Sequence, residues 1–120
     1  MSQTIVTRPI GPTFALSVGA AQHAPVAIPP VQGETSNYAE FTNIGSTDVC
    51  VVVTPFSAVP SSPTLVFPLD GVPTVPSSFL LPHGMTQPRV VAVPANGFCV
   101  SAIGSASGPS IFYLTQVSSV

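Results

Sequence analysis

Ionised side chains are scarce in this chain of 120 residues. It has two arginines, four acidic residues and no lysine, and its formal net charge is −2. Nucleic acids require several basic side chains against their phosphates, and anionic membrane surfaces attract proteins in the same way. Arg8 and Arg89 are too few and too far apart in the sequence for either task. The composition therefore predicts no nucleic-acid partner and no membrane partner.

The scarcity of charge also bears on the surface of the folded chain. Soluble proteins usually have about a quarter of their residues charged, whereas this chain has 5%. Charged groups keep protein surfaces apart in solution, so Ser, Thr, Gln, Asn and Pro must cover most of this surface. Two interpretations stay open: a small neutral secreted or structural β-domain, and a subunit whose surface is largely occupied by neighbours. The composition favours the second.

Helical periodicity and long apolar runs are missing as well. No spacing typical of an amphipathic helix persists for two turns. The longest uninterrupted apolar run, residues 49–53, is far shorter than the roughly 20 residues of a membrane-spanning helix. Residues 1–11 lack the apolar core and cleavage site of a secretory signal peptide. We therefore expect a chain that is made and used in the cytosol, unless it leaves the cell inside a larger particle.

Short runs of β-branched and aromatic residues, separated by Gly and Pro, recur along the chain. This spacing is typical of sandwiches and jelly rolls. It predicts an all-β fold: a jelly-roll-like antiparallel β-sandwich of about eight strands, formed as a single domain by residues 13–120. The expected strands cover residues 13–18, 26–28, 38–43, 49–54, 64–67 and 78–81, with three more between 89 and 116.

Turn residues suggest how two groups of these strands are joined. Residues 89–116 contain three apolar runs with turn-forming residues at 94–97 and 104–110, which predicts a three-stranded meander. Residues 44–48 are expected to join 38–43 and 49–54 as a hairpin. Both faces of 49–53 are apolar, so this strand should be central and covered twice, by the second sheet and by something outside the domain.

Two proline-bearing stretches are the predicted contact regions. Residues 1–12 are expected to form an extended N-terminal arm, because proline fixes φ and removes a hydrogen-bond donor. Residues 55–76 contain six prolines and are expected to run as an extended surface loop. The predicted interface residues from both stretches are Ile5, Val6, Ile10, Leu65, Phe67 and Val72.

The sequence offers little for catalysis. His23 and His83 are the available bases, and the four carboxylates are scattered in or beside polar loops. Cys50 and Cys99 are either small buried hydrophobic residues or a disulfide pair, and neither has the spacing of a metal site. The sequence therefore predicts no catalytic residues, no metal site, no cofactor and no enzyme.

Two segments, NYAEFTNIGSTDVCVVVT and SFLLPHGMTQPRVVAVPANGFCVSAIGSASGPSIFYLTQ, resemble small β-sandwich structural proteins of tailed bacteriophages. The resemblance covers about residues 38–116 and rests on an F-x-N-x-G run before a valine-rich strand, and on turn glycines before the final strand. Within that class the chain is similar to capsid cement, or decoration, proteins with a jelly-roll fold. The resemblance implies a protein made in the host bacterial cytoplasm and located on the capsid surface of the virion. It implies binding to the major capsid protein, as a dimer or trimer that bridges capsomers.

A function from another class stays open. A carbohydrate-binding or host-attachment module of a phage tail or fibre would need aromatic and polar side chains at one loop end, near Tyr38, His83 and Tyr113. An enzyme would need His23 or His83 buried beside a carboxylate.

Overall fold

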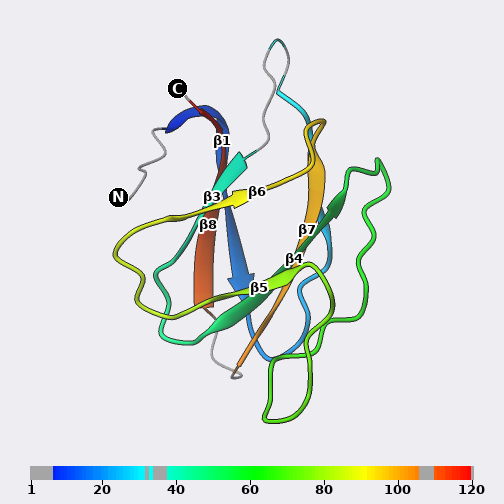
Figure 1. Ribbon diagram of the computed structural model, residues 1–120, viewed down its shortest axis with the longest axis vertical. Coiled ribbons are helices and arrows are strands. Elements are labelled where there is room, and N and C mark those ends of the chain that lie inside the picture. The colour runs from blue at the N-terminus through cyan, green and yellow to red at the C-terminus, as the bar shows by residue number, and fades with distance from the viewer. Residues whose placement is uncertain (1–6, 32, 34–37, 106–109, 120) are drawn as a thin grey trace.

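The computed structural model describes residues 7–31, 33, 38–105 and 110–119 (Figure 1). Within these residues eight strands form two antiparallel four-stranded sheets, so the predicted all-β sandwich of about eight strands is confirmed. The strands are β1 (Thr7–Val18), β2 (Val26–Ile28), β3 (Tyr38–Asn43), β4 (Val49–Pro55), β5 (Ser78–Leu81), β6 (Arg89–Ala92), β7 (Phe98–Gly104) and β8 (Ser110–Ser119).

The strand order is that of one folded ribbon. The first sheet has the order β1-β8-β3-β6 and the second sheet has the order β2-β7-β4-β5. Strand β4 pairs with β5, β3 with β6, β2 with β7 and β1 with β8, so the chain doubles back on itself between β4 and β5. Wrapping this ribbon adds two further pairs, β3 with β8 and β4 with β7.

The predicted meander over residues 89–116 and the predicted hairpin over residues 38–54 are wrong. Among the described residues, β6, β7 and β8 do not pair with one another, and neither do β3 and β4. The connections β3–β4, β6–β7 and β7–β8 each cross from one sheet to the other. A link as short as residues 93–97 can span the roughly 10 Å between packed sheets. Turn residues mark where the chain reverses, but they do not determine which strand it pairs with.

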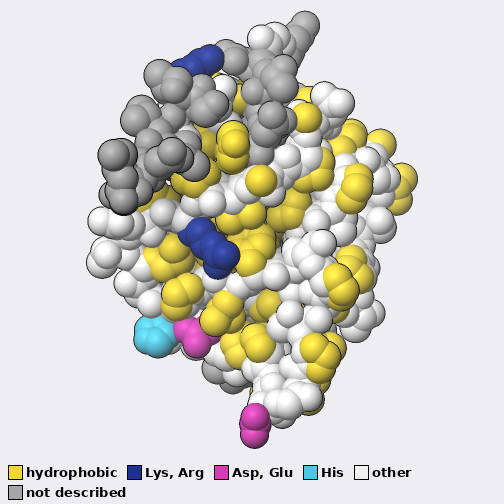
Figure 2. All heavy atoms as spheres, viewed as in Figure 1, with side chains coloured by type: hydrophobic (Ala, Val, Ile, Leu, Met, Phe, Trp, Pro, Cys, Tyr) yellow, Lys and Arg dark blue, Asp and Glu magenta, His cyan; other side chains and the backbone are white. Residues whose placement is uncertain are grey.

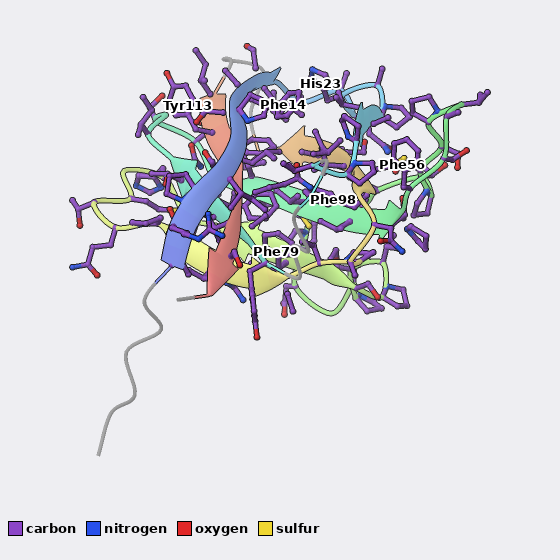
Figure 3. The ribbon with its side chains drawn as sticks, turned by 90° about the horizontal axis from the view of Figure 1, so that it is seen from above. Phe14, His23, Phe56, Phe79, Phe98 and Tyr113 are labelled. Atoms are coloured by element: carbon purple, nitrogen blue, oxygen red, sulfur yellow. The ribbon has the colours of Figure 1, made fainter. Side chains whose placement is uncertain are left out.

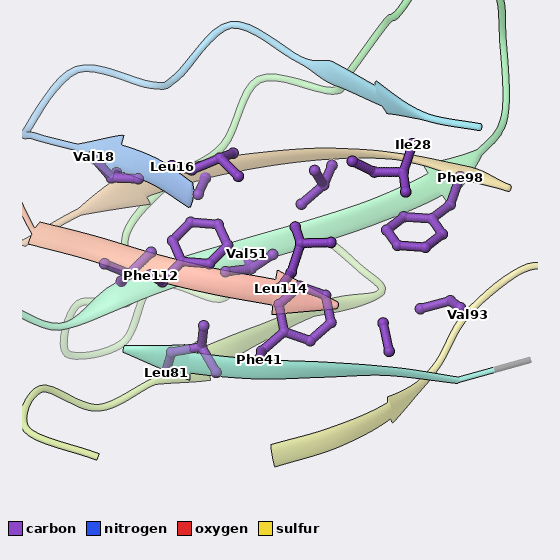
Figure 4. Close-up of a cluster of buried hydrophobic side chains, with 14 residues drawn as sticks. Leu16, Val18, Ile28, Phe41, Val51, Leu81, Val93, Phe98, Phe112 and Leu114 are labelled. Carbon is purple, nitrogen blue, oxygen red and sulfur yellow. The ribbon is translucent and has the colours of Figure 1, made fainter. Parts of the chain in front are cut away.

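The core lies between the inner faces of the two sheets (Figure 4). Strand β3 shows the alternation most clearly, since every second side chain from Ala39 to Asn43 is buried. The ring of Phe41 lies 5.1 Å from that of Phe79 and 6.3 Å from that of Phe112, centroid to centroid. Burying each such side chain stabilises the fold by about 1.5–3 kcal/mol.

The first strand begins earlier than expected. Residues 7–12, which were predicted to belong to an extended arm, are the first half of β1, and Thr7 to Pro9 pair with Val117 to Ser119. The prediction is wrong here because β1 is an edge strand, where prolines need no partner on the outer side. The register shifts between Pro9 and Thr13, which accommodates Pro12. Residues 1–6 lie outside the described residues.

A buried asparagine holds the corner between β3 and β4. The Asn43 side chain donates to the carbonyl oxygens of Thr47 (2.9 Å) and Leu81 (3.0 Å). Its oxygen accepts from the backbone N–H of Gly45 (3.0 Å) and from Ser110 Oγ (2.9 Å). The loop at 44–48 is thereby closed over one end of the sandwich, which gives the F-x-N-x-G run its physical role.

Gly45 is the tightest position of this corner. A Cβ atom there would overlap Ser110 Oγ and lie 2.8 Å from Ser110 Cα. We predict that Gly45→Ala lowers the free energy of unfolding by about 1–3 kcal/mol, because backbone or Ser110 must move. Urea denaturation measures the change. Ser46→Ala, at the exposed neighbouring position, is the matched control, and equal stability of the two variants would contradict this account.

Candidate interaction surface

The outer face of the second sheet is covered by the chain itself. Cys50 and Val52 of β4, and Cys99 and Ser101 of β7, alternate with the core residues of these strands and are nevertheless buried. Strand β4 is central, as predicted, but its outward side chains are already buried within the single chain, so no cover from outside the domain is needed. Residues 55–76, called the proline-rich segment below, lie against this sheet. The sulfur of Cys99 lies 3.8 Å from the Ser57 carbonyl oxygen.

Gln22 anchors the proline-rich segment to the sheet. Its amide nitrogen lies within hydrogen-bonding distance of Ser62 Oγ (3.2 Å), the Pro63 carbonyl (3.0 Å) and Ser101 Oγ (3.0 Å). Its side-chain oxygen accepts from the backbone N–H of Leu65 (2.8 Å). One side chain therefore satisfies polar groups on both the segment and β7, and fixes where the segment crosses the sheet.

This anchoring changes the role of the residues predicted from the segment. Leu65 is only 4% exposed, so its prediction as an interface residue is wrong: it covers the domain's own sheet. Phe67 is half-buried, and Val72 is 45% exposed and free to contact a partner. The strand predicted at 64–67 is not formed, since flanking prolines interrupt a ladder.

Apolar side chains on the proline-rich segment make the clearest candidate surface. Five of the eight large hydrophobic side chains that are exposed in the described part of the chain belong to it. In Figure 3, Phe56 lies at the end of the molecule formed by this segment, whereas Phe98 points into the interior. Sequence reasoning found only Val72, and it missed Phe56, Val59, Val66 and Leu69.

The tip of the segment is a small hairpin turn. The backbone N–H of Val72 donates to the Leu69 carbonyl oxygen at 3.0 Å, and the two residues form an isolated β-bridge. Gly71 has φ of 75°, as a type II turn requires at its third position. The turn holds Leu69 and Val72 together and points Asp70 outward, with Leu69 65% exposed.

The remaining predicted interface residues lie near the start of the chain. Ile10 is half-buried and lines a hollow of about 190 Å³ between β1 and the residues after β2. It therefore packs within its own domain rather than serving as a free anchor. Ile5 and Val6 lie outside the described residues. The hollow is lined by Ile10, Gly11, Pro12, Phe14, Pro29, Pro30, Val31 and Gln116.

The two cysteines are free and buried. Cys50 stands opposite Ile103 and Cys99 stands opposite Thr54 on the paired strands β4 and β7. The two positions are thus four residues apart along the ladder, or about 13 Å, too far for a disulfide. Burial raises the pKa of the Cys50 thiol. Both cysteines are buried and unbridged, as small hydrophobic residues are.

The two histidines differ in their surroundings. His23 is half-buried, and its Nδ1 lies 2.7 Å from the Ala24 carbonyl oxygen. His83 has an exposed side chain whose Nδ1 lies 2.7 Å from Asp48 Oδ1, and its backbone N–H donates to the same oxygen at 2.9 Å. Within the described residues no hydroxyl or thiol makes a hydrogen bond to the other ring nitrogen of His83, so this pair joins two loops and lacks a nucleophile.

The aromatic residues of the carbohydrate-binding alternative do not gather at one end of the sandwich. Tyr38 begins β3, and Asn43 ends it about 16 Å further along. His83 lies at the Asn43 end, because the backbone N–H of nearby Met85 donates to the Asn43 carbonyl oxygen. Tyr113 stands opposite Thr42, also toward that end.

Neither a metal cluster nor a membrane-spanning helix is found in the part of the chain that the structure describes. Comparison of the chain with protein-family models, with curated proteins and with solved structures gave no match.

Gln22 provides a direct test of the anchored segment. We predict that Gln22→Ala leaves the Leu65 N–H and Ser101 hydroxyl without this partner and lowers the free energy of unfolding by about 1–3 kcal/mol. Limited proteolysis should then cut residues 55–76 faster than in the unaltered protein. Gln87→Ala, in an exposed turn, is the control. Unchanged cleavage in Gln22→Ala would show that the side chain does not hold the segment.

The Asp48–His83 contact predicts a pH dependence. The hydrogen bonds from the His83 side chain and backbone lower the pKa of Asp48 below its ordinary value of 3.8. The folded state therefore favours the carboxylate, and this contribution is present above about pH 3.8 and is lost as the pH falls through the lower folded-state pKa. Its size is small because the side chains are exposed to solvent.

Asp48→Asn should accordingly lower the urea midpoint at pH 6, and the difference should shrink as the pH falls below 3.8. His83→Ala removes the ring but leaves the backbone N–H of residue 83 in place. Combining Asp48→Asn with His83→Ala therefore separates the contribution of the ring from that of the backbone hydrogen bond. A difference that stays constant from pH 6 to pH 2 would contradict the assignment.

Proposed function

We propose that this chain is a structural virion protein of a tailed bacteriophage, a cement or decoration protein. It binds the outside of the capsid shell, contacts the major capsid protein and bridges capsomers. It is made in the host bacterial cytoplasm, assembles as a homo-oligomer, and has no enzymatic activity and no cofactor.

The strand order supports a jelly roll. A jelly roll is an eight-stranded double sheet, and viral capsid domains are among the proteins that use it. The nested pairs β1–β8, β2–β7, β3–β6 and β4–β5, wrapped so that β3 meets β8 and β4 meets β7, are compatible with this arrangement. The fold supports the proposal only as a scaffold, because jelly rolls serve many functions.

The observation that carries the proposal is the apolar surface of the proline-rich segment. Its exposed hydrophobic side chains stand on a backbone that is extended by prolines and tied down through Gln22. A surface that is ordered before binding loses little conformational entropy on contact. Apolar contacts also tolerate salt, whereas exposed ion pairs are screened. These are useful properties for a protein that joins many equivalent sites on a shell.

The carbohydrate-binding alternative has less support. Tyr38 lies at the opposite end of β3 from the corner near His83, so the side chains that it needs do not form one platform.

Shell binding and copy number test the proposal. We predict that virions of the phage that encodes this chain contain on the order of hundreds of copies, as expected for a site repeated over an icosahedral shell. Quantitative mass spectrometry against the major capsid protein measures this number. A handful of copies per particle would contradict a cement role and favour the neck or tail.

Binding to capsid shells also tests the role of the proline-rich segment. Phe56→Ser combined with Val59→Ser should weaken binding to undecorated shells about 10-fold or more, because two exposed apolar contacts are removed. Co-sedimentation with the shells measures occupancy. Ile111→Ser, which changes an exposed residue of β8 outside the segment, is the matched control. Equal occupancy of all three proteins would remove the segment from the interface.

A further inference from the structure

Arg89 presents a rigid positive charge on the side of the sandwich where β5 and β6 lie. Its guanidinium carbon is 5.3 Å from the centroid of the Phe79 ring, and Nη1 donates to the Leu80 carbonyl oxygen at 3.0 Å. Phe79 is itself fixed by its edge-on contact with Phe41 in the core. Stacking and a backbone hydrogen bond together restrict the side chain to one orientation.

This cation has no acidic partner among the described residues of its own chain. The ion pair that the structure records there joins His83 and Asp48, and no carboxylate lies within 4.0 Å of Arg89. A guanidinium has five N–H donors, and the Leu80 carbonyl takes one of them. The group therefore remains available for a carboxylate, which it binds well in a two-pronged geometry.

The surroundings of Arg89 are apolar. Figure 2 shows the basic side chain over β5 and β6 with hydrophobic side chains on several sides. Of the residues that contact Arg89, Leu80 is exposed and Phe79 is half-buried, and Val91, two residues further along β6, is also half-buried. A partner that brings both a carboxylate and apolar side chains would pair with this charge and cover its apolar neighbours in one contact.

The tip of the proline-rich segment has both features. Asp70 is exposed there, between the exposed side chains of Leu69 and Val72 that the turn holds together. Figure 2 shows an acidic side chain at the bottom edge of the view, at the rim of the side on which the basic side chain near the centre lies. The tip and the Arg89 region are thus complementary in charge, are both partly apolar, and are both accessible from one side of the molecule.

We propose that this face binds a second copy of the chain, with Asp70 of each copy on Arg89 of the other. Two complementary regions on one face allow a two-fold axis between them, so that the contact is made twice. Leu69 and Val72 then pack beside Leu80 and Phe79 around each ion pair. The face measures about 40 × 39 Å, which leaves room for the roughly 800 Å² that each partner buries in a standard interface. The inference rests on the homo-oligomer of the proposed function and names the surface through which it forms.

Charge reversal tests the pairing. Asp70→Arg and Arg89→Asp should each weaken the dimer about 10-fold or more per contact, hence about 100-fold for the two contacts, because like charges then meet. The double variant Asp70→Arg/Arg89→Asp should recover most of the affinity. Sedimentation equilibrium of the full chain at several concentrations measures the dissociation constant. Ile111→Asp adds a charge to β8, outside both the segment and the Arg89 region, and should leave that constant unchanged.

Mixing the two single variants sharpens the test. Each alone brings like charges together, whereas a mixed dimer has opposite charges at both contacts. An equimolar mixture should therefore dimerise although neither variant does so alone, which also shows that both remain folded. Raising the salt concentration should weaken the unaltered dimer, because its ion pairs are screened.

Three different results would overturn the proposed pairing of Asp70 with Arg89. A protein that stays monomeric up to about 100 μM, a concentration that would reveal even a weak dimer, would overturn the pairing. So would a dimer that tolerates both single reversals, or a mixture that fails to associate. The pairing and the function can also fail separately. A dimer that follows the charge pattern but does not bind shells retains the pairing and removes the cement role, while shell binding by a monomer does the reverse.

Discussion

Strand β4 carries apolar side chains on both faces, and much of the second sheet is arranged by the need to cover both. Val49 and Val51 face the first sheet, whereas Cys50 and Val52 face outward and are still buried. A bare outer face here would leave a continuous apolar area in water, which monomers rarely tolerate. The chain covers this face with its own proline-rich segment.

The composition of that segment explains what it then leaves exposed. Prolines keep the backbone extended and unable to join the sheet, so hydrogen bonds through Gln22 attach it instead. An extended backbone turns its side chains alternately toward and away from the sheet. Leu65 accordingly faces inward and is buried, while its neighbour Val66 is exposed. Covering one apolar face thus creates a second one, farther out and already ordered, which is the surface that the proposed partner would contact.

The sequence predicted strands well and their pairing poorly. Alternation and β-branched residues located residues 38–43 and 78–81 correctly, because they reflect which side chains face the core. The crossing of β3 to β4 between the sheets depends on Asn43, whose partners Leu81 and Ser110 are distant in sequence. No local pattern reveals such contacts. The same limit applies to the candidate surface: Leu65 and Leu69 are equally hydrophobic, and only the position of Gln22 and the turn at Gly71 bury one and expose the other.

Scarcity of charge gives each remaining charge more influence on specificity. Apolar contacts are non-directional and would allow this surface to associate in many orientations. In the proposed pairing, a single cation fixed on Phe79 and a single carboxylate at a turn would reject most of those orientations, because a misplaced partner leaves a charge against apolar groups. The net affinity from the ion pair itself is modest, while the penalty for wrong arrangements is large. A surface that is mostly neutral therefore needs very few ionised residues to select one mode of association, provided that they are held rigidly, as Arg89 is.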